Sequence, residues 1–336
     1  MAPGGAALAT GERASRPPLC IAAIVVTFNR LPALQVTLGR LLEEPLDQIV
    51  IVDNGSTDGT RDWISSLVEP RLTVILTAEN RGGAAGFETG LREAVDRFDP
   101  DWCVLMDDDA YPASGAIAAF RDLDLDGLDA VAAAVRLPSG QIAEFNRPWH
   151  APFAGLRATA RLLRGRAGFH IADEAYASSE SLLPIDGASF VGYFIARSGI
   201  DRAGFPDGRL FIYGDDVLYS LRLRARGGKM GFAPAIGFVH DCGVVAPRDI
   251  VRPLWKTYYL YRNRWHIYRA AAGPVLFWPI ICTMAAAWLA RSLRLAPVER
   301  HRYLHLTRLA LEDGMRGSFD RSHAEILAVG GRLRRG

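Results

Sequence analysis

The chain has 336 residues, enough to bury the core of one large domain or of a domain with an appendage. Apolar residues make up 49% and charged residues 23%, which excludes an intrinsically disordered protein. The net charge of +2 hides an asymmetry, because residues 251–336 carry 15 Lys and Arg against 5 Asp and Glu, and residues 1–250 carry 24 against 32. Such a basic C-terminal part indicates a surface that meets phosphates, of lipid headgroups or of nucleic acid.

Residues 1–18 are rich in Ala, Gly, Pro and Ser, and they lack the basic start and the uninterrupted apolar run of a signal peptide. We expect a disordered tail there, and a body that stays on the cytoplasmic side. The four cysteines are scattered with no CxxC pair, which argues against a disulfide framework or structural zinc and fits a reducing cytosol.

Strand and helix patterns alternate four times after the tail. Apolar runs predict strands covered on both faces, and helical spacing or glycines predict the helices between them. The strands are expected at 21–28, 48–54, 72–78 and 102–106, and the helices at 31–44, 57–68 and from the glycines 82–86 through 97. This alternation predicts a doubly wound, mostly parallel α/β sheet.

The pattern after residue 112 is less regular. Residues 113–185 are expected to form loops and helices on the side of the site where a second substrate, the acceptor, would bind. A strand passing into a helix is predicted at 186–200, a short apolar stretch with an amphipathic helix at 210–227, and a last strand at 235–240.

Polar side chains follow each of the first four predicted strands. Ligands bind at the carboxyl ends of the strands in such sheets, so we expect these side chains to share one edge. They are Thr27, Asn29, Asp53, Asn54, Asn80 and the triplet Asp107, Asp108 and Asp109. An acidic surface turn is the alternative for the triplet, but its position after the fourth strand favours a Mg²⁺ or Mn²⁺ site that holds a substrate diphosphate.

Two further polar features lie later in the chain. Asp215 and Asp216 open a predicted helix. One interpretation is that acids at this position only complement the helix dipole. The other is that Asp216 serves as a general base for a sugar hydroxyl. His240 ends an apolar strand, where a core histidine is common, and only its pairing with the aspartates indicates a metal ligand.

The stretch 80-NRGGAAGF-87 places glycines between a strand and a helix. Glycines allow close backbone approach, and a helix N-terminus favours a phosphate. The stretch is neither GxGxxG nor a P-loop motif, so a tight turn without a ligand stays open.

Residues 270–290 form a run of 21 positions without charge, flanked by arginines on both sides. Prolines interrupt the run, so we expect it to lie in the membrane interface rather than to span the bilayer. Trp278, Trp288, Tyr258 and Tyr259 would then be anchors at headgroup level, with arginines on anionic lipid. A buried helical pair is the alternative. The long uncharged segment among the arginines argues against nucleic acid as the partner.

Taken together, the motifs resemble family 2 glycosyltransferases of the GT-A fold. The matching stretches occur in the family's order over residues 20–245; they are 25-VVTFNR-30, 49-IVIVDNGSTDGT-60, 80-NRGGAAGF-87, 105-LMDDDAYP-112, 187-GASFVGYFIAR-197, 211-FIYGDDVLYSLRLRARG-227 and 234-PAIGFVH-240. The resemblance implies a GT-A catalytic domain at 19–245 and a basic, aromatic, helical, membrane-associating region at 246–336.

The resemblance also implies roles for single residues. Asp216 would be the catalytic base, with Asp215 where many members carry glutamate. Asp107, Asp109 and His240 would bind Mn²⁺ or Mg²⁺. The nucleotide sugar would contact Thr27, Asn29, Arg30, Asp53, Asn54, Asn80, Arg81, Gly82, Gly83, Asp107 and Asp108, with Asp53 on the uridine. The implied reaction inverts the anomeric centre without a covalent intermediate.

Within the family, 80-NRGGAAGF-87 is most similar to galactofuranosyltransferases, although Ala85 replaces a glycine of their NxGGxGGF-like loops. This favours a UDP-galactofuranose donor and a lipid-linked or cell-envelope glycan acceptor, for a peripheral enzyme on the cytoplasmic side of the inner membrane. Related rhamnosyltransferases using dTDP-rhamnose share much of the pattern and stay an alternative. A second alternative is a non-catalytic scaffold of the same fold. Retention of the expected catalytic and metal-binding residues argues against it; they are Asp107, Asp109, Asp216 and His240. A nucleotidyltransferase is disfavoured because TFNRLP follows the first strand where a glycine-rich basic loop would be expected.

Overall fold

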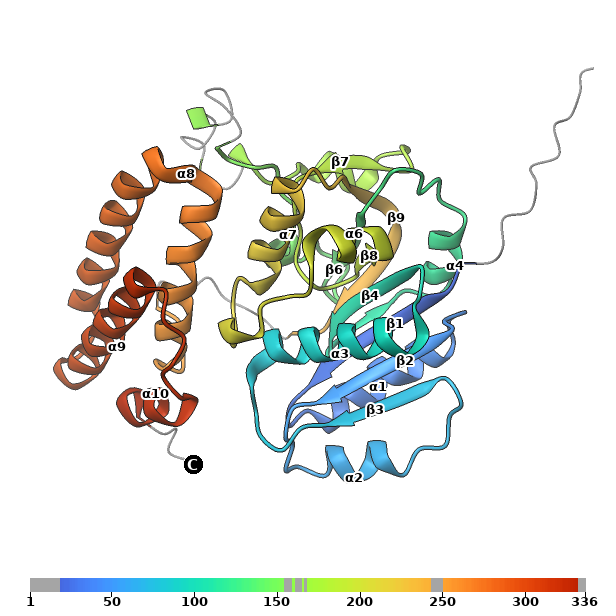
Figure 1. Cartoon of the computed structure of the whole chain (residues 1–336), viewed down its shortest axis with the longest axis horizontal. Helices are drawn as coiled ribbons and strands as arrows, with labels where there is room; N and C mark the ends of the chain where they lie inside the picture. Colours follow the sequence, from blue (N-terminus) through green and yellow to red (C-terminus); the bar gives the residue numbers. More distant parts are fainter. Residues whose placement is uncertain (1–18, 154–158, 161–164, 166–167, 243–249, 332–336) are drawn as a thin grey trace, which may run out of the picture.

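The computed structural model describes residues 19–153, 159–160, 165, 168–242 and 250–331. The tail expected at 1–18 lies outside the described residues. Figure 1 shows a central sheet with helices on both faces and, beside it, a separate block of helices from the C-terminal part of the chain. The sheet has nine strands in the order β3-β2-β1-β4-β8-β6-β9-β5, with β7 paired to β9.

The first four strands confirm the predicted parallel, doubly wound arrangement. They are β1 (Ile21–Thr27), β2 (Gln48–Asp53), β3 (Leu72–Leu76) and β4 (Trp102–Asp107), all mutually parallel where they pair. Thr27 lies opposite Asp53, and Val26 lies opposite Asp107, so the polar strand ends meet at one edge. The helices between them are α1 (Leu31–Leu42), α2 (Thr60–Ser65) and α3 (Gly82–Phe98).

The other half of the sheet is mixed rather than parallel. Strand β8 (Tyr193–Ala196) is antiparallel to β4, β6 (Ala130–Arg136) is antiparallel to β8, and β9 (Met230–His240) is parallel to β6. The short strands β5 (Ala110–Pro112) and β7 (Leu183–Ile185) are both antiparallel to β9. Helices α4 (Ala116–Arg121), α6 (Arg197–Ala203) and α7 (Asp215–Ala225) complete this half.

Residues 113–185 therefore contain strands where the sequence indicated only loops and helices. Strand β6 reads AVAAAVR and is buried from Ala130 through Val135. Alanine carries little strand preference, and a strand covered on both faces shows no alternation, so periodicity alone does not reveal it. The last strand is also longer than predicted, because β9 begins at Met230 rather than at 235.

The core lies on both faces of the sheet, because alternate residues of each buried strand point to opposite sides. Along β1, Ile21, Ala23 and Val25 belong to one apolar cluster, and Ala22, Ile24 and Val26 belong to the other. All of the first five are fully buried and Val26 is nearly so. A strand covered in this way holds the polar edge that follows it at a fixed place.

The C-terminal block consists of α8 (Lys256–Arg291), α9 (Pro297–Arg316) and α10 (His323–Gly330). Helix α8 bends at Gly273, which has φ 65° and ψ 179°, into a first arm (256–272) and a second arm (274–291). Figure 1 shows the two arms side by side, with the first arm nearer the sheet. A third apolar cluster joins both arms to α9 and α10.

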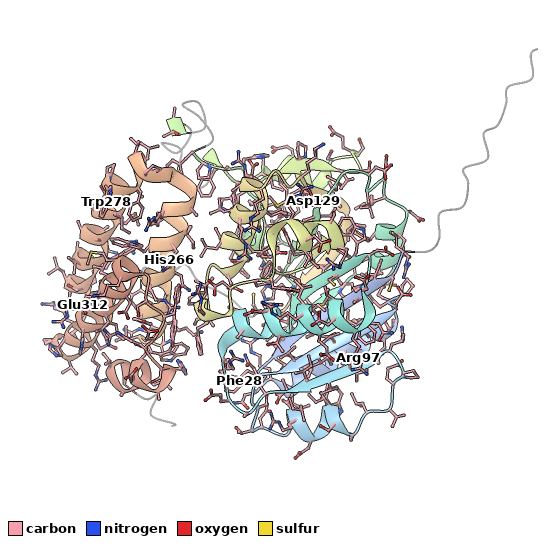
Figure 2. The ribbon with its side chains drawn as sticks, viewed as in Figure 1. Phe28, Arg97, Asp129, His266, Trp278 and Glu312 are labelled. Atoms are coloured by element: carbon pink, nitrogen blue, oxygen red, sulfur yellow. The ribbon has the colours of Figure 1, made fainter. Side chains whose placement is uncertain are left out.

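Three of the four expected membrane anchors are core residues instead. Tyr258, Tyr259 and Trp288 are all buried in the third cluster, where the ring of Trp288 stacks on Tyr261 at 4.1 Å between centroids. Trp278 differs, because 58% of it is exposed, and it lies on the arm farther from the sheet (Figure 2). The expected surface segment thus has one face packed on protein and one face open.

Candidate active site

Asp107, Asp109 and His240 converge at the carboxyl edge of the sheet. One ligand atom from each lies within 4.8 Å of the others. The pairing of β5 with β9 brings this about, because Ala110 lies opposite His240 and so places the acidic turn beside the end of β9. The His240 Nε2 atom is 3.1 Å from Asp109 Oδ1. Two carboxylates and an imidazole suit a hard divalent cation such as Mn²⁺.

Asn146 orients the histidine. Its Oδ1 lies 2.8 Å from His240 Nδ1, and because an amide oxygen only accepts, Nδ1 carries the proton. Without a cation, Nε2–H donates to Asp109 Oδ1; with a cation bound, the neutral ring would present its Nε2 lone pair to that cation, as a metal ligand requires. Asn146 ends a short 3₁₀ turn (Glu144–Asn146) in the irregular region, where no sequence motif marked it. Asp107, Asp109 and His240 thus fit a bound cation.

Asp108 points away from this group and toward the first strand. Thr27 Oγ1 donates to Asp108 Oδ2 at 2.7 Å, and the amide of Phe28 donates to the same oxygen at 3.4 Å. Burial raises the pKa of Asp108 to about 6 and that of Asp107 to about 7. Burial also acts on Asp109, but hydrogen bonding and charge from His240, and then from Arg30, hold its pKa below the ordinary value.

Arg30 is the cation nearest to this acidic turn. Its guanidinium pairs with Asp109 and lies 3.5 Å from Asp108, and about half of its side chain is exposed. Burial and then the charge of Arg30 lower the pKa of Lys256, whose Nζ lies 5.9 Å from the ring centroid of Tyr213, two residues before Asp215. Sequence patterns did not indicate Lys256 here, because it belongs to the C-terminal block.

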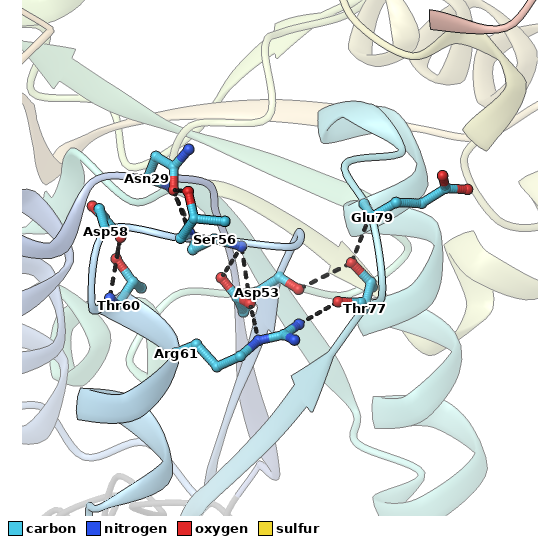
Figure 3. A network of polar contacts seen from close by, with 9 residues as sticks. Asn29, Asp53, Ser56, Asp58, Thr60, Arg61, Thr77 and Glu79 are labelled. Carbon is cyan, nitrogen blue, oxygen red and sulfur yellow. Dashed lines mark hydrogen bonds and ion pairs between the residues drawn. The ribbon is translucent and has the colours of Figure 1, made fainter. Parts of the chain in front are cut away.

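The predicted uridine contact, Asp53, lies at the same edge but is already bonded. Both of its oxygens accept from the amide of Ser56 at 3.2 Å, and Oδ2 also accepts from Arg61 Nε at 3.1 Å (Figure 3). Asn29, which has φ 54°, accepts from the amide of Thr57 through Oδ1 at 2.7 Å. These bonds fix the loops after β1 and β2 against each other.

The glycine loop is tied to the same edge by Asn54. Its Nδ2 donates to the carbonyl of Gly82 at 2.8 Å, and its Oδ1 accepts from the amide of Arg81 at 3.2 Å. Asn80 Oδ1 accepts from the amide of Gly82 at 2.8 Å. Gly83 has no atom within 4 Å of where a Cβ would stand, so the N-terminus of α3 is open there.

Asp215 and Asp216 form the first turn of α7, after Gly214. Their side chains keep some exposed surface, but the surrounding protein is dense enough to raise both pKa values. Burial raises the pKa of Asp216 to about 6. Burial, then the charge of Asp216, and further the charge of Asp107 raise the pKa of Asp215. The charge of Asp107 therefore reaches Asp215, and that the acidic pair and the metal group form one site stays a prediction.

Comparisons with known proteins show the family of the chain. Residues 22–181 match the model for "Glycosyl transferase family 2". The chain is 30% identical over 271 residues to "Galactofuranosyltransferase GlfT1" of Mycobacterium tuberculosis (strain ATCC 25618 / H37Rv), which covers 73% of this chain and 81% of that relative. It is 27% identical over 262 residues to the protein of the same name from Mycolicibacterium smegmatis, covering 74% and 82%.

Solved structures show the same fold. The mannosyltransferase PcManGT from Pyrobaculum calidifontis, in complex with GDP-Man and Mn²⁺, superimposes with a TM-score of 0.50 at 21% identity, covering 94% of this chain and 80% of that one. GalNAc-T7 with UDP, GalNAc and Mn²⁺ gives a TM-score of 0.58 at 12% identity, covering 94% and 57%. The chain belongs to glycosyl transferase family 2, and it is a glycosyltransferase of the GT-A fold.

Proposed function

We propose that the protein transfers galactofuranose from UDP-galactofuranose to a lipid-linked or cell-envelope glycan acceptor, with inversion and with Mn²⁺ or Mg²⁺. The observation that carries the proposal is the convergence of Asp107, Asp109 and His240 at the carboxyl edge of the sheet. Similarity to galactofuranosyltransferases over about three quarters of the chain supports the choice of sugar.

Asp216 is the base in this proposal. Its carboxylate takes the proton of the acceptor hydroxyl while that oxygen bonds to the anomeric carbon, and the bond from this carbon to the diphosphate breaks on the opposite face. Asp107, Asp109 and His240 would hold the cation, which when bound would offset the charge on the departing diphosphate. No carboxylate nucleophile is required, because one displacement inverts the centre.

The nucleotide sugar would lie along the edge formed by Thr27, Asn29, Asp53 and the loop from Asn80 to Gly83. The amides of Gly82 and Ala84 already donate to Asn80 and to the Phe211 carbonyl, so at the start of α3 it is the N–H of Gly83 that would meet a phosphate. Arg30 is half-exposed and paired with Asp109, so it is placed to turn from that carboxylate to the donor diphosphate when a cation takes its position. Asp108 would hold Thr27 in place from behind.

The acceptor side of the proposal rests on the second arm of α8. Its outward face is largely apolar, and its exposed residues recur at helical spacing as far as Leu293, just after the arm. They are Val275, Pro279, Cys282, Ala286, Leu289 and Leu293, with Trp278 beside them. The described residues include one helical stretch, Lys256–Arg294, that is long and apolar enough to cross a membrane, with 11% of its most apolar 18-residue window buried. The bend at Gly273 and the packing of the other face favour an arm lying in the headgroup region. We propose that the protein is peripheral, on the cytoplasmic side of the inner membrane.

A thermal-shift titration of the purified protein with UDP, dTDP and GDP, each with and without Mn²⁺, tests the donor. A ligand at about a hundred times its Kd stabilises the folded state by about 2.7 kcal/mol. We expect Mn²⁺-dependent stabilisation by UDP. A preference for dTDP would instead indicate a rhamnosyl donor, and a folded protein that responds to no nucleotide would contradict the enzymatic proposal and favour a scaffold.

A further inference from the structure

The loop before the acidic pair has a strained backbone. Phe211 has φ 69° and ψ −71°, and the amide of Ile212 donates to the carbonyl of Leu210 at 2.9 Å. This is a γ-turn of the rare kind with positive φ at its centre. Tyr213, two residues later, has φ 70°. Positive φ at a bulky residue is unfavourable and persists only where the surrounding structure enforces it.

Asn263, on the first arm of α8, supplies much of that enforcement. Its side chain is fully buried, and its Nδ2 donates toward three carbonyls of the loop: Leu210 at 3.0 Å, Ile212 at 2.9 Å and Tyr213 at 2.8 Å. In an extended chain these carbonyls could not face one amide nitrogen. The amide thus recognises the strained conformation itself.

Arg262 fixes the amide in the required orientation. Its Nε donates to Asn263 Oδ1 at 3.0 Å, which leaves Nδ2 to face the loop. Its Nη2 donates to the carbonyls of Arg209 at 3.1 Å and Leu210 at 2.8 Å. Arg262 is 1% exposed, and the rings of Tyr258, Tyr259 and Phe319 surround its guanidinium at about 5 Å. Among the described residues no carboxylate pairs with it, so its charge is used on backbone carbonyls and rings.

The same loop also contacts the glycine loop on the donor side. The Phe211 carbonyl accepts from the amide of Ala84 at 3.1 Å, and a Cβ at Gly82 would lie 2.1 Å from that carbonyl oxygen. The Phe211 ring stacks on Tyr259 at 4.5 Å and on His323 at 4.4 Å between centroids, and both of these residues belong to the C-terminal block. Residues 209–214 therefore connect the C-terminal block to the glycine loop and to the start of α7.

We propose that Arg262 and Asn263 are positioning residues of the transfer reaction. They hold residues 209–214 in the strained conformation from which α7 begins, and thereby fix where Asp215 and Asp216 lie relative to the metal group. The proposal rests on the function proposed above for the acidic pair. It assigns to the C-terminal block a part in the catalytic geometry, in addition to any contact with the membrane.

The full-length variant Asn263→Ala tests this, with Thr257→Val as the matched control. Thr257 is buried in the same arm, and its hydroxyl has no hydrogen-bond partner among the described residues, so its removal should change nothing in the loop. For each protein, amide hydrogen exchange is measured over 209–216 and over β1 and β4. Binding of UDP with Mn²⁺ and turnover of UDP-galactofuranose are measured on the same samples.

In Asn263→Ala we expect exchange over 209–216 to rise about tenfold or more with β1 and β4 unchanged. We also expect a kcat lower by about 10²-fold, because a misplacement near 1 Å costs that much, and a smaller change in the binding of UDP with Mn²⁺. Unchanged exchange over 209–216, or a kcat equal to that of the control, would overturn the proposal.

If Asn263→Ala does not fold, Arg262→Lys is judged by the same criteria, since lysine keeps the buried charge but loses the Nε donor that orients Asn263. A wild-type protein that transfers no galactofuranose would contradict the proposed function alone. The exchange measurement would then still decide whether Asn263 holds the loop.

Discussion

His240 and Asp109 are 131 residues apart in sequence, yet His240 Nε2 lies 3.1 Å from Asp109 Oδ1 at the edge of the sheet. Burial lowers the pKa of His240, but the hydrogen bond to Asp109 and then the charge of Asp107 outweigh this and raise it above the ordinary value. The two aspartates thus stabilise positive charge at this point, which is what a bound cation supplies.

Replacing His240 with Ala should abolish the stabilisation that Mn²⁺ with UDP confers in a thermal-shift assay. The histidine supplies one of three protein ligands, and its loss leaves two carboxylates that hold a cation weakly. Asp241→Asn is the control, because it changes an exposed side chain that is next to His240 but is not a member of the group. An equal response of both variants to Mn²⁺ would contradict the assigned ligand set.

The rate of transfer should fall as the pH falls through about 6. A general base works only when ionised, and burial raises the pKa of Asp216 from its ordinary value to about 6. Above that pH the carboxylate is ionised and kcat should be level; below it, kcat should drop about tenfold per pH unit. A profile of kcat against pH checks this, and a profile flat down to pH 5 would exclude Asp216 as the base.

Gly82→Ala and Gly83→Ala should differ sharply although the two positions are adjacent. At Gly82 the backbone has φ +82° and a Cβ would meet the Phe211 carbonyl, so we expect a loss of about 2 kcal/mol or more in the free energy of unfolding. At Gly83 nothing lies within 4 Å, so the variant should stay folded. Denaturant unfolding measures both.

The Gly83→Ala variant also reports on the donor site. If the diphosphate approaches the backbone there, the added methyl should weaken binding of UDP with Mn²⁺ while leaving stability intact. Titration calorimetry checks this. Wild-type affinity in Gly83→Ala would remove Gly83 from the donor contacts.

Val275→Asp combined with Trp278→Asp should weaken binding to vesicles that contain anionic phospholipid. Both side chains are exposed on the second arm, at 82% and 58%. Burying each in lipid contributes roughly 1.5–3 kcal/mol, so we expect the affinity for the vesicles to fall by at least about tenfold per position. Val68→Asp is the control, since Val68 is fully exposed on the catalytic domain. Equal cosedimentation of the two variants would mean that this arm does not contact lipid.

The sequence predicts the half of the molecule in which local pattern and tertiary structure agree. The strands before Thr27, Asp53 and Asp107 are continuous apolar runs, so the residue pattern alone is enough to place their polar ends at one edge. The residue pattern does not predict strand β6, because five of its seven residues are alanine or arginine, which have little strand preference.

Other features could not be predicted because they depend on contacts between distant segments. No local pattern connects Asn146 with His240, or Asn263 with the carbonyls of the 210–213 loop. Hydropathy also does not tell what covers an apolar side chain. Tyr258 and Trp288 therefore resemble membrane anchors in the sequence, whereas the fold buries them against other helices.

The most direct test of the account is transfer of radiolabelled galactofuranose from UDP-galactofuranose into organic-extractable lipid. The purified wild-type protein and Asp216→Asn are compared, each with Mn²⁺ and with EDTA. We predict transfer by the wild-type protein with Mn²⁺, and a rate lower by about 10²–10⁴-fold in Asp216→Asn. Transfer by Asp216→Asn at the wild-type rate, or wild-type transfer that is unaffected by EDTA, would contradict the account.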